Sequence, residues 1–347
     1  MKVKYTFLAI IACMTSCSNF DREFPDFDYT TCYFPYQYPV RTIILGNYIY
    51  DNSNDNNHIF VISAAMGGVY TNDKDRTVDF TVDESLCDNA WFSYDDHVPV
   101  LPLPSQYYQL SNASRIVIPA GKVNGGVEVQ LSDEFFNDPL AYSNNFVIPL
   151  RITGVSNLDS VLTGNSVAAG ADPRIASEWA VAPKHFTMFG VKFVNPWHGS
   201  YLHYGSAEVR ESDAVVEDSV YSAKYVEQND VLSLTTVGKT SVASSSIVLK
   251  SKVLTGIVAI RLNFSSDDYS SDGGVTCTVE SASDGGFTVS GSGKYLMNAE
   301  EYGGKKRDAI YLNYTVSNGT ATYSAADTFV FRDKGVNLET YTPEIVK

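Results

Sequence analysis

Residues 258–264 read Val-Ala-Ile-Arg-Leu-Asn-Phe, with a large apolar side chain at every second position. Because successive side chains of a β-strand point to opposite faces, this pattern predicts a strand with one buried face. The same alternation recurs between turns rich in Gly, Asn and Asp, at residues 78–82, 116–118, 127–131, 146–152 and 310–316. Pro149 inside one such run predicts an edge strand or a bulge, since Pro cannot donate a backbone hydrogen bond. The sequence therefore predicts an all-β protein without crossover helices.

The strands fall into two groups. Residues 163–183 separate the two groups. This segment is rich in small and turn-forming residues and contains two prolines. A chain of 347 residues is also longer than one hydrophobic core usually serves. We therefore expect a β-sandwich at residues 30–183 and a closed or nearly closed antiparallel barrel at residues 184–347, in which Asn318-Gly319 forms a hairpin turn.

The composition is that of a globular protein, with 44% hydrophobic and 19% charged residues. This mixture excludes a wholly disordered, collagen-like or coiled-coil chain. Asp and Glu number 40 against 25 Lys and Arg, which gives a net charge of -15. A chain with this net negative charge repels phosphate backbones, and the sequence contains no basic stripe that would offset it. We therefore expect no nucleic acid among its partners.

The first residues have the features of an export signal. Two lysines precede an apolar run at residues 5–12, and Cys17 follows a Ser where cleavage is expected. We therefore predict a lipoprotein signal peptide at residues 1–16 and a lipidated tether at residues 17–29, with Cys17 acylated. Several acyl chains on one Cys would anchor the protein firmly to a membrane. An ordinary secretory signal with an incidental Cys is the alternative.

Three cysteines lie beyond this segment: Cys32, Cys87 and Cys277. They form neither a CxxC motif nor a disulfide framework. Two interpretations stay open at this stage: a single bridge between Cys32 and Cys87, or three buried free thiols.

Several motifs resemble those of a known family. They are Tyr33–Thr42, Gly67–Asn72, Phe135–Pro139, Ile148–Ile152, Val191–Tyr201 and Gly303–Asp308. The mature chain is similar over its length to two-domain surface lipoproteins of Bacteroidetes. The resemblance implies an immunoglobulin-like N-terminal domain and a calycin-like, or lipocalin-like, C-terminal β-barrel, both domains of unknown function. It also implies an outer-membrane protein that faces the cell exterior, with a SusE/SusF-like accessory role in polysaccharide utilisation beside a SusC/SusD-like complex.

Aromatic side chains are the best lead to a ligand, because sugar rings stack on flat aromatic faces while carboxylates and amides bond the hydroxyls. The first candidates are Trp91, Tyr94, Asp95 and Asp96. They lie in a stretch without alternation, which predicts an exposed binding loop; a loop pinned to its own domain by Trp91 is the alternative. The further candidates are Trp197, Tyr201, Tyr107 and Trp179. For Trp197, near the first barrel strand, core packing is the alternative.

No nucleophile, zinc or phosphate-binding motif stands out in the sequence. Residues 51–57 resemble the start of a calcium loop but lack its sharp-turn Gly and closing Glu, so a calcium site and a hydrated turn both stay open. We therefore expect a lipid-anchored glycan-binding protein that is not an enzyme and carries no cofactor or metal. Its expected partners are an oligo- or polysaccharide and a membrane. A structural or adhesive protein and a glycan hydrolase are the alternatives.

Overall fold

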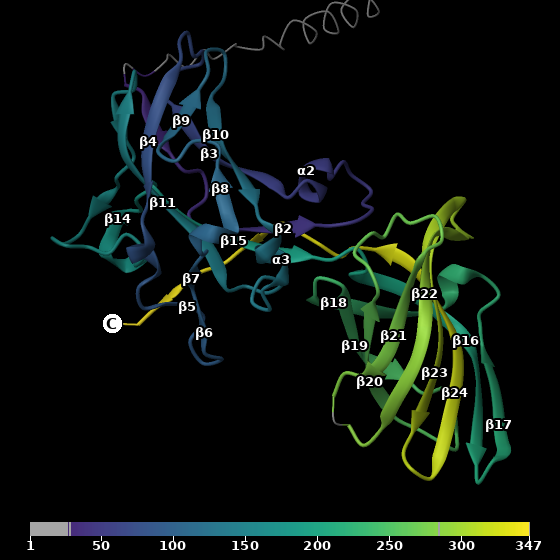
Figure 1. Ribbon diagram of the computed structural model, residues 1–347. Coiled ribbons are helices and arrows are strands. Elements are labelled where there is room, and N and C mark those ends of the chain that lie inside the picture. Colours follow the sequence, from purple (N-terminus) through teal and green to yellow (C-terminus); the bar gives the residue numbers. More distant parts are fainter. Residues whose placement is uncertain (1–26, 28, 284, 347) are drawn as a thin grey trace, which may run out of the picture.

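The computed structural model describes residue 27 and residues 29–283 and 285–346 (Figure 1). The predicted signal peptide, the lipidation site Cys17 and most of the predicted tether lie outside these residues. The described chain forms a sheet-rich N-terminal domain followed by a closed barrel of eight strands. The predicted all-β fold is therefore confirmed. No helix in this part of the chain combines the length and the apolar character needed to cross a bilayer.

The N-terminal domain is a sandwich of two sheets. One has the order β12 (Ser160–Val161), β1 (Thr31–Tyr33), β3 (Ile59–Gly67), β10 (Asn124–Leu131) and β8 (Tyr108–Leu110). The other has the order β25 (Glu339–Thr340), β2 (Pro39–Ile44), β15 (Phe186–Val194), β11 (Phe146–Ser156), β4 (Arg76–Val82) and β9 (Arg115–Ile118), and β7 (Leu101–Pro102) also pairs with β11. Alternate residues of both sheets meet in one core, with Phe60 and Ile62 from β3 and Ile148 and Leu150 from β11.

Pro149 lies in a central strand, so the predicted edge position is wrong; the register shift that β11 does contain lies a few residues further along, between Ile152 and Gly154. β11 has β15 on one side and β4 on the other. The last pair between β11 and β4 joins Leu150 to Val82, and the Pro149 carbonyl accepts a hydrogen bond from the Asp83 amide. The Pro149 nitrogen faces the same side as its carbonyl, where β4 has already ended. No strand hydrogen bond is therefore lost.

The barrel comes from the second half of the chain. Its sheet has the order β17 (Ala214–Tyr221), β16 (Gly199–Glu211), β18 (Asp230–Gly238), β19 (Ser241–Val248), β20 (Ile257–Phe264), β21 (Val275–Ser281), β22 (Thr288–Tyr302), β23 (Lys305–Ser317) and β24 (Ala321–Asp333). β16 also pairs with β24, which closes the barrel and leaves β17 as an additional strand beside β16. Gly319, at a φ of 87°, lies in the predicted turn between β23 and β24.

Short elements complete the fold. A two-stranded sheet pairs β13 (Asn165–Ser166) with β14 (Trp179–Val181), and a three-stranded sheet has the order β26 (Glu344–Ile345), β5 (Ala90–Ser93) and β6 (Val98–Pro99). The helices are α2 (Ser53–Asn56) and α3 (Asp133–Asn137), with 3-10 turns at Glu84–Cys87, Ser105–Tyr107, Ala176–Glu178 and Val226–Gln228.

The structural boundary between the domains differs from the predicted one at residues 183 and 184. β15 follows that point but pairs with β11 and with β2, so it belongs to the sandwich. Apolar residues cover both of its faces, and such a run identifies a strand without showing which strands it joins, which is why the sequence placed it wrongly. After β24 the chain returns to the sandwich, where β25 pairs with β2 and β26 pairs with β5 (Figure 1). Two chain crossings therefore connect the domains.

The three cysteines in the described chain are buried free thiols. The structure thus excludes the alternative of a bridge between Cys32 and Cys87. Burial raises the pKa of the Cys32, Cys87 and Cys277 thiols to about 12 each. All three thiols stay protonated in the folded protein at neutral pH.

Candidate functional site

The acidic and aromatic stretch that follows Ala90 forms a hairpin instead of an irregular loop. Trp91 lies on β5, opposite Pro99 of β6 on one side and Glu344 of β26 on the other. Tyr94, Asp95 and Asp96 lie exposed at or beside the hairpin turn. The returning C-terminal segment therefore holds Trp91 in place from the far end of the sequence.

Trp91 lines a hollow of about 520 Å3, which we call the Trp91 pocket. Its wall includes apolar residues such as Leu101, and its polar residues include Glu84, Asp88 and Asn89. These three are exposed, whereas Trp91 is half-buried. The Tyr94 ring meets the Trp91 ring edge to face, with 5.3 Å between the ring centroids. The pocket thus places an aromatic ring beside carboxylate and amide groups, a combination that can bind a sugar.

Trp179 lines a second hollow of about 330 Å3, the Trp179 pocket. The aromatic residues around it are Tyr36, Tyr38, Trp179, Phe186 and Tyr341. Tyr36 is 61% exposed, so its ring is available to a ligand. The Trp179 indole donates a hydrogen bond of 2.7 Å to the Asp172 carbonyl, which fixes the ring against the turn before it. Trp91 and Trp179 thus each line a pocket, which is a requirement for contact with a ligand.

Arg174 connects the two pockets. Its guanidinium lines the Trp179 pocket and donates hydrogen bonds of 2.8 and 2.7 Å to the carbonyls of Leu86 and Asp88, at the Trp91 pocket. It also binds both carboxylate oxygens of Asp172, at 2.9 and 2.7 Å, and this hydrogen bonding raises the pKa of Arg174. The guanidinium is thus a structural bridge that fixes the spacing of the two pockets.

A chain of aromatic rings borders the Trp179 pocket and packs against the buried cluster of Cys87, Ala90 and Val100, which lines the Trp91 pocket. Centroid distances are 4.5 Å from Phe92 to Tyr341, 5.5 Å from Tyr341 to Tyr38, and 5.9 Å from Tyr38 to Phe186. The Tyr341 hydroxyl donates to the Met188 carbonyl at 3.0 Å, and burial raises the pKa of this tyrosine. The two pockets therefore share one rigid base, to which the C-terminal segment contributes the central ring.

Sequence reasoning did not select Tyr36 or Arg174 as site residues. Tyr36 lies in the proline- and tyrosine-rich stretch Tyr33–Thr42, which was noted only for its family resemblance. Arg174 lies in the segment interpreted as a linker. The density of prolines beside aromatic rings was the available signal, because such stretches form rigid surface loops.

Trp197 and Tyr201 are not ligand contacts, so these two predictions are wrong. They are 0% and 1% exposed, inside the barrel core. The Trp197 ring stacks on Phe264 with 3.8 Å between centroids, and the Tyr201 hydroxyl donates to the Trp197 carbonyl at 2.7 Å. A solute outside the barrel cannot reach either ring. The alternative of core packing holds.

Tyr107 lies apart from both pockets. Its ring packs against Phe135 and Phe146 of the sandwich core, with centroid distances of 6.5 and 6.1 Å. Its hydroxyl donates a hydrogen bond of 2.9 Å to the Asp138 carboxylate. Both the ring and the hydroxyl of Tyr107 therefore make contacts within the sandwich domain.

The segment at residues 51–57 forms the short helix α2 and not a calcium loop. The buried Asp55 carboxylate accepts a hydrogen bond of 2.9 Å from the Ile44 amide and forms an ion pair with Arg41. The Asn52 side chain donates to the carbonyls of Ile44 and Gly46, both at 2.8 Å. No group of three or more potential metal-binding side chains occurs among the residues that the structure describes. The oxygen-rich pattern instead caps the end of β2.

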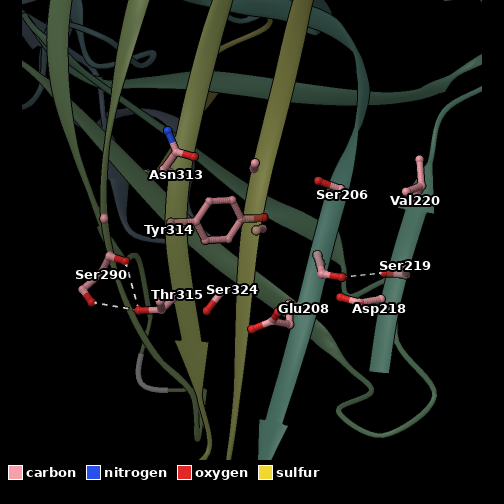
Figure 2. Close-up of a pocket in the computed structure, with 14 residues that line it drawn as sticks. Ser206, Glu208, Asp218, Ser219, Val220, Ser290, Asn313, Tyr314, Thr315 and Ser324 are labelled. Carbon is pink, nitrogen blue, oxygen red and sulfur yellow. Dashed lines mark hydrogen bonds between the residues drawn. The ribbon is translucent and has the colours of Figure 1, made fainter. Parts of the chain in front are cut away.

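A third hollow of about 730 Å3, the barrel groove, lies on the outer face of the barrel (Figure 2). It extends across β17, β16, β24, β23 and β22. The side chains along it are small or polar, among them Ser206, Glu208, Asn313, Thr315 and Ser324. Tyr314 also borders it, but its hydroxyl donates to the buried Asp327 carboxylate at 2.7 Å. The barrel groove therefore offers no aromatic face for stacking.

Comparisons with known proteins place the chain in a family. No curated protein matches it. The family model for a domain of unknown function, DUF5627, matches residues 196–335, and a model described as an N-terminal domain matches residues 27–159. A solved structure of an auxiliary nutrient binding protein from Bacteroides thetaiotaomicron is 13% identical, covers 84% of this chain and 90% of its own, and overlaps with a TM-score of 0.35. That overlap is too low to support an argument.

A solved protein of unknown function from Bacteroides ovatus is much more similar. It is 38% identical and superposes with a TM-score of 0.83, over 92% of this chain and 100% of its own. The chain therefore belongs to the same family as this Bacteroides ovatus protein, a two-domain family of Bacteroidetes in which an N-terminal domain precedes DUF5627.

Proposed function

We propose that this protein is a non-catalytic, lipid-anchored protein of the outer membrane surface that binds oligo- or polysaccharide as an accessory to polysaccharide uptake. The Trp91 pocket is the observation that carries the proposal. It combines a half-buried aromatic ring with exposed carboxylate and amide groups in a hollow of about 520 Å3. A sugar ring stacks its apolar face on such an aromatic, and its hydroxyls bond the polar groups around it.

The Trp179 pocket extends the proposed binding surface. Arg174 and the aromatic chain through Tyr341 hold it at a fixed position relative to the Trp91 pocket. A polymer that contacts Trp91 and Trp179 at once gains affinity, because the second contact is intramolecular once the first has formed. This favours a chain of several sugar units over a single monosaccharide. The proposed anchor at Cys17 adds to this effect by concentrating the protein near an importer.

Replacing Trp91 with Ala should weaken glycan binding about tenfold, because the stacking partner is lost together with its buried area. The measurement is affinity gel electrophoresis of the chain from Ser18 onward against plant, host and microbial polysaccharides, followed by calorimetry with the glycan that retards it. Trp91→Phe keeps a flat ring and should retain most of the affinity. Tyr225→Ala changes an aromatic of the barrel that is 51% exposed and should bind like the unmodified chain.

If no glycan of the panel retards the unmodified chain, the proposal fails. If a glycan retards the unmodified and Trp91→Ala chains equally, glycan binding stands but its assignment to the Trp91 pocket is wrong. Release of shortened products from the retarding glycan would instead support an enzyme.

A further inference from the structure

β17 has a free edge. It is the terminal strand in the order of its sheet and pairs with β16 alone. Among the described residues, its backbone forms no hydrogen bond with any other segment. In such a strand, about half of the amides and carbonyls point outward, where another extended chain can pair with them. β17 therefore presents an available template for strand addition.

The side chains of β17 increase its capacity for pairing. Val215, Val216 and Val220 are 45%, 44% and 81% exposed, although β-branched apolar residues favour burial between paired strands. Natural edge strands are commonly protected by Lys, Pro or a covering loop, and β17 contains neither Lys nor Pro. The loop at residues 251–253 reaches β17 only through the Glu217 carboxylate, which accepts hydrogen bonds from Ser251, Lys252 and Val253; it does not pair with the described backbone of β17. Exposed valines on an edge with an unpaired backbone indicate a surface that a partner covers.

The barrel groove begins at this strand. Asp218 and Val220 form one side of it, and the small side chains of Ser206 and Ser324 lie on the neighbouring strands (Figure 2). Side chains of an added strand alternate between two faces, so those on the outer face would lie beside Asp218 and Val220. The groove leaves room there for long side chains to extend across β16.

The charge of the hairpin that β16 and β17 form indicates which kind of partner fits this edge. Between Ser206 and Tyr221 the sequence has five acidic residues and one Arg. This Arg210 already pairs with Glu208, at 2.5 Å. A second copy of β17 is a poor partner. Full antiparallel overlap of two copies places Glu217 of each copy opposite Asp218 of the other, and like charges at opposed positions are destabilising. A Lys or Arg on the incoming strand would form an ion pair with Asp218.

We propose that the free edge of β17 docks an extended, basic segment of another protein by strand addition. The segment carries a Lys or Arg beside Asp218 and a β-branched residue beside Val220, two positions apart on the same face. Backbone hydrogen bonds supply affinity, and these two side chains supply specificity. The docking surface lies on the barrel, apart from the two pockets of the sandwich, so it is independent of glycan binding.

The test measures fluorescence anisotropy of a labelled peptide, Thr-Lys-Thr-Val-Thr-Lys-Thr-Val, titrated with the chain from Ser18 onward. The peptide should bind, and its counterpart with Glu in place of Lys should bind at least about tenfold more weakly. The double variant Asp218→Lys/Val220→Lys should lose about tenfold affinity for the basic peptide, because attraction becomes repulsion. The matched control is Val231→Lys, at a valine that is 52% exposed on the barrel but lies on β18, where it pairs with Leu202 of β16.

Three results would overturn the proposal: no binding of the basic peptide, equal binding of both peptides, or an equal loss in the Val231→Lys control. Light scattering after size exclusion supplies a further test. A dimer that the double variant dissociates would show that a second copy occupies the edge, and this too would overturn it. Because Asp218 and Val220 are exposed, the double variant should keep the circular dichroism spectrum of the unmodified chain.

Discussion

Replacing Trp197 with Ala should lower the free energy of unfolding of the barrel by about 3–5 kcal/mol. The Trp197 side chain is fully buried and stacks on Phe264 at an interplanar angle of 7°. It also meets Tyr295 edge to face, with 6.2 Å between centroids. Truncation to Ala removes these contacts and leaves a cavity that the closed strands around it cannot fill by local movement.

Guanidinium unfolding followed by far-ultraviolet circular dichroism measures this loss. Trp197→Phe should cost much less, since it retains a ring on Phe264 and removes an indole N–H that has no hydrogen-bond partner in the described structure. Tyr225→Ala, at an exposed barrel position, should leave the midpoint almost unchanged. A Trp197→Ala protein as stable as the unmodified chain would contradict the core assignment. It would return Trp197 to the set of ligand candidates.

The barrel shows what periodicity can predict. Alternation in residues 258–264 and 310–316 identified β20 and β23 and the faces that they bury, because a period of two is a local property of an extended chain. Alternation does not say which strands pair. β15 is also recognisable as a strand from its apolar residues but lies in the sandwich, where its partner β2 precedes it by more than a hundred residues. The domain boundary was therefore misplaced for a physical reason.

The candidate site shows the same limit. Trp91 was selected from the sequence within an aromatic and acidic stretch that lacks alternation, and Trp179 as a further aromatic candidate. Their arrangement depends on contacts that the sequence does not reveal, such as the bond from Arg174 to the Asp88 carbonyl and the ring of Tyr341 between Phe92 and Tyr38. Composition also could not separate Trp91 from Trp197, since both are aromatic residues near turns. Burial separates them, and burial is a property of the assembled fold.

The buried Lys334 leads to a prediction about pH. Lys334 is only 2% exposed and lies just after β24, where the chain leaves the barrel. Its ammonium donates to the Pro196 carbonyl at 2.5 Å and to the Asn195 carbonyl at 3.4 Å, on the other chain crossing between the domains. Burial disfavours the charged form and lowers the pKa of Lys334 from its ordinary 10.5 to about 7, although Asp308 acts in the opposite direction.

The pKa of Lys334 is therefore lower in the folded than in the unfolded chain. Between these two values the folded protein holds a neutral amine, and unfolding takes up a proton. The unfolded state binds more protons, so the contribution of Lys334 to stability increases as the pH rises through this interval. The three cysteine thiols act in the opposite sense above about pH 8.5, because burial raises their pKa and unfolding lets them ionise.

Comparison with Lys334→Met isolates the lysine, since the thiols are present in both proteins and cancel in the difference. The stability of the unmodified chain relative to Lys334→Met should rise by about 2 kcal/mol between about pH 7.5 and pH 9. The loss of hydrogen bonds to Asn195 and Pro196 adds an offset that does not depend on pH. Guanidinium unfolding of both proteins across this range measures the difference. A difference that stays constant would show that Lys334 keeps an ordinary pKa, and hence that water reaches its ammonium at the junction between the two domains.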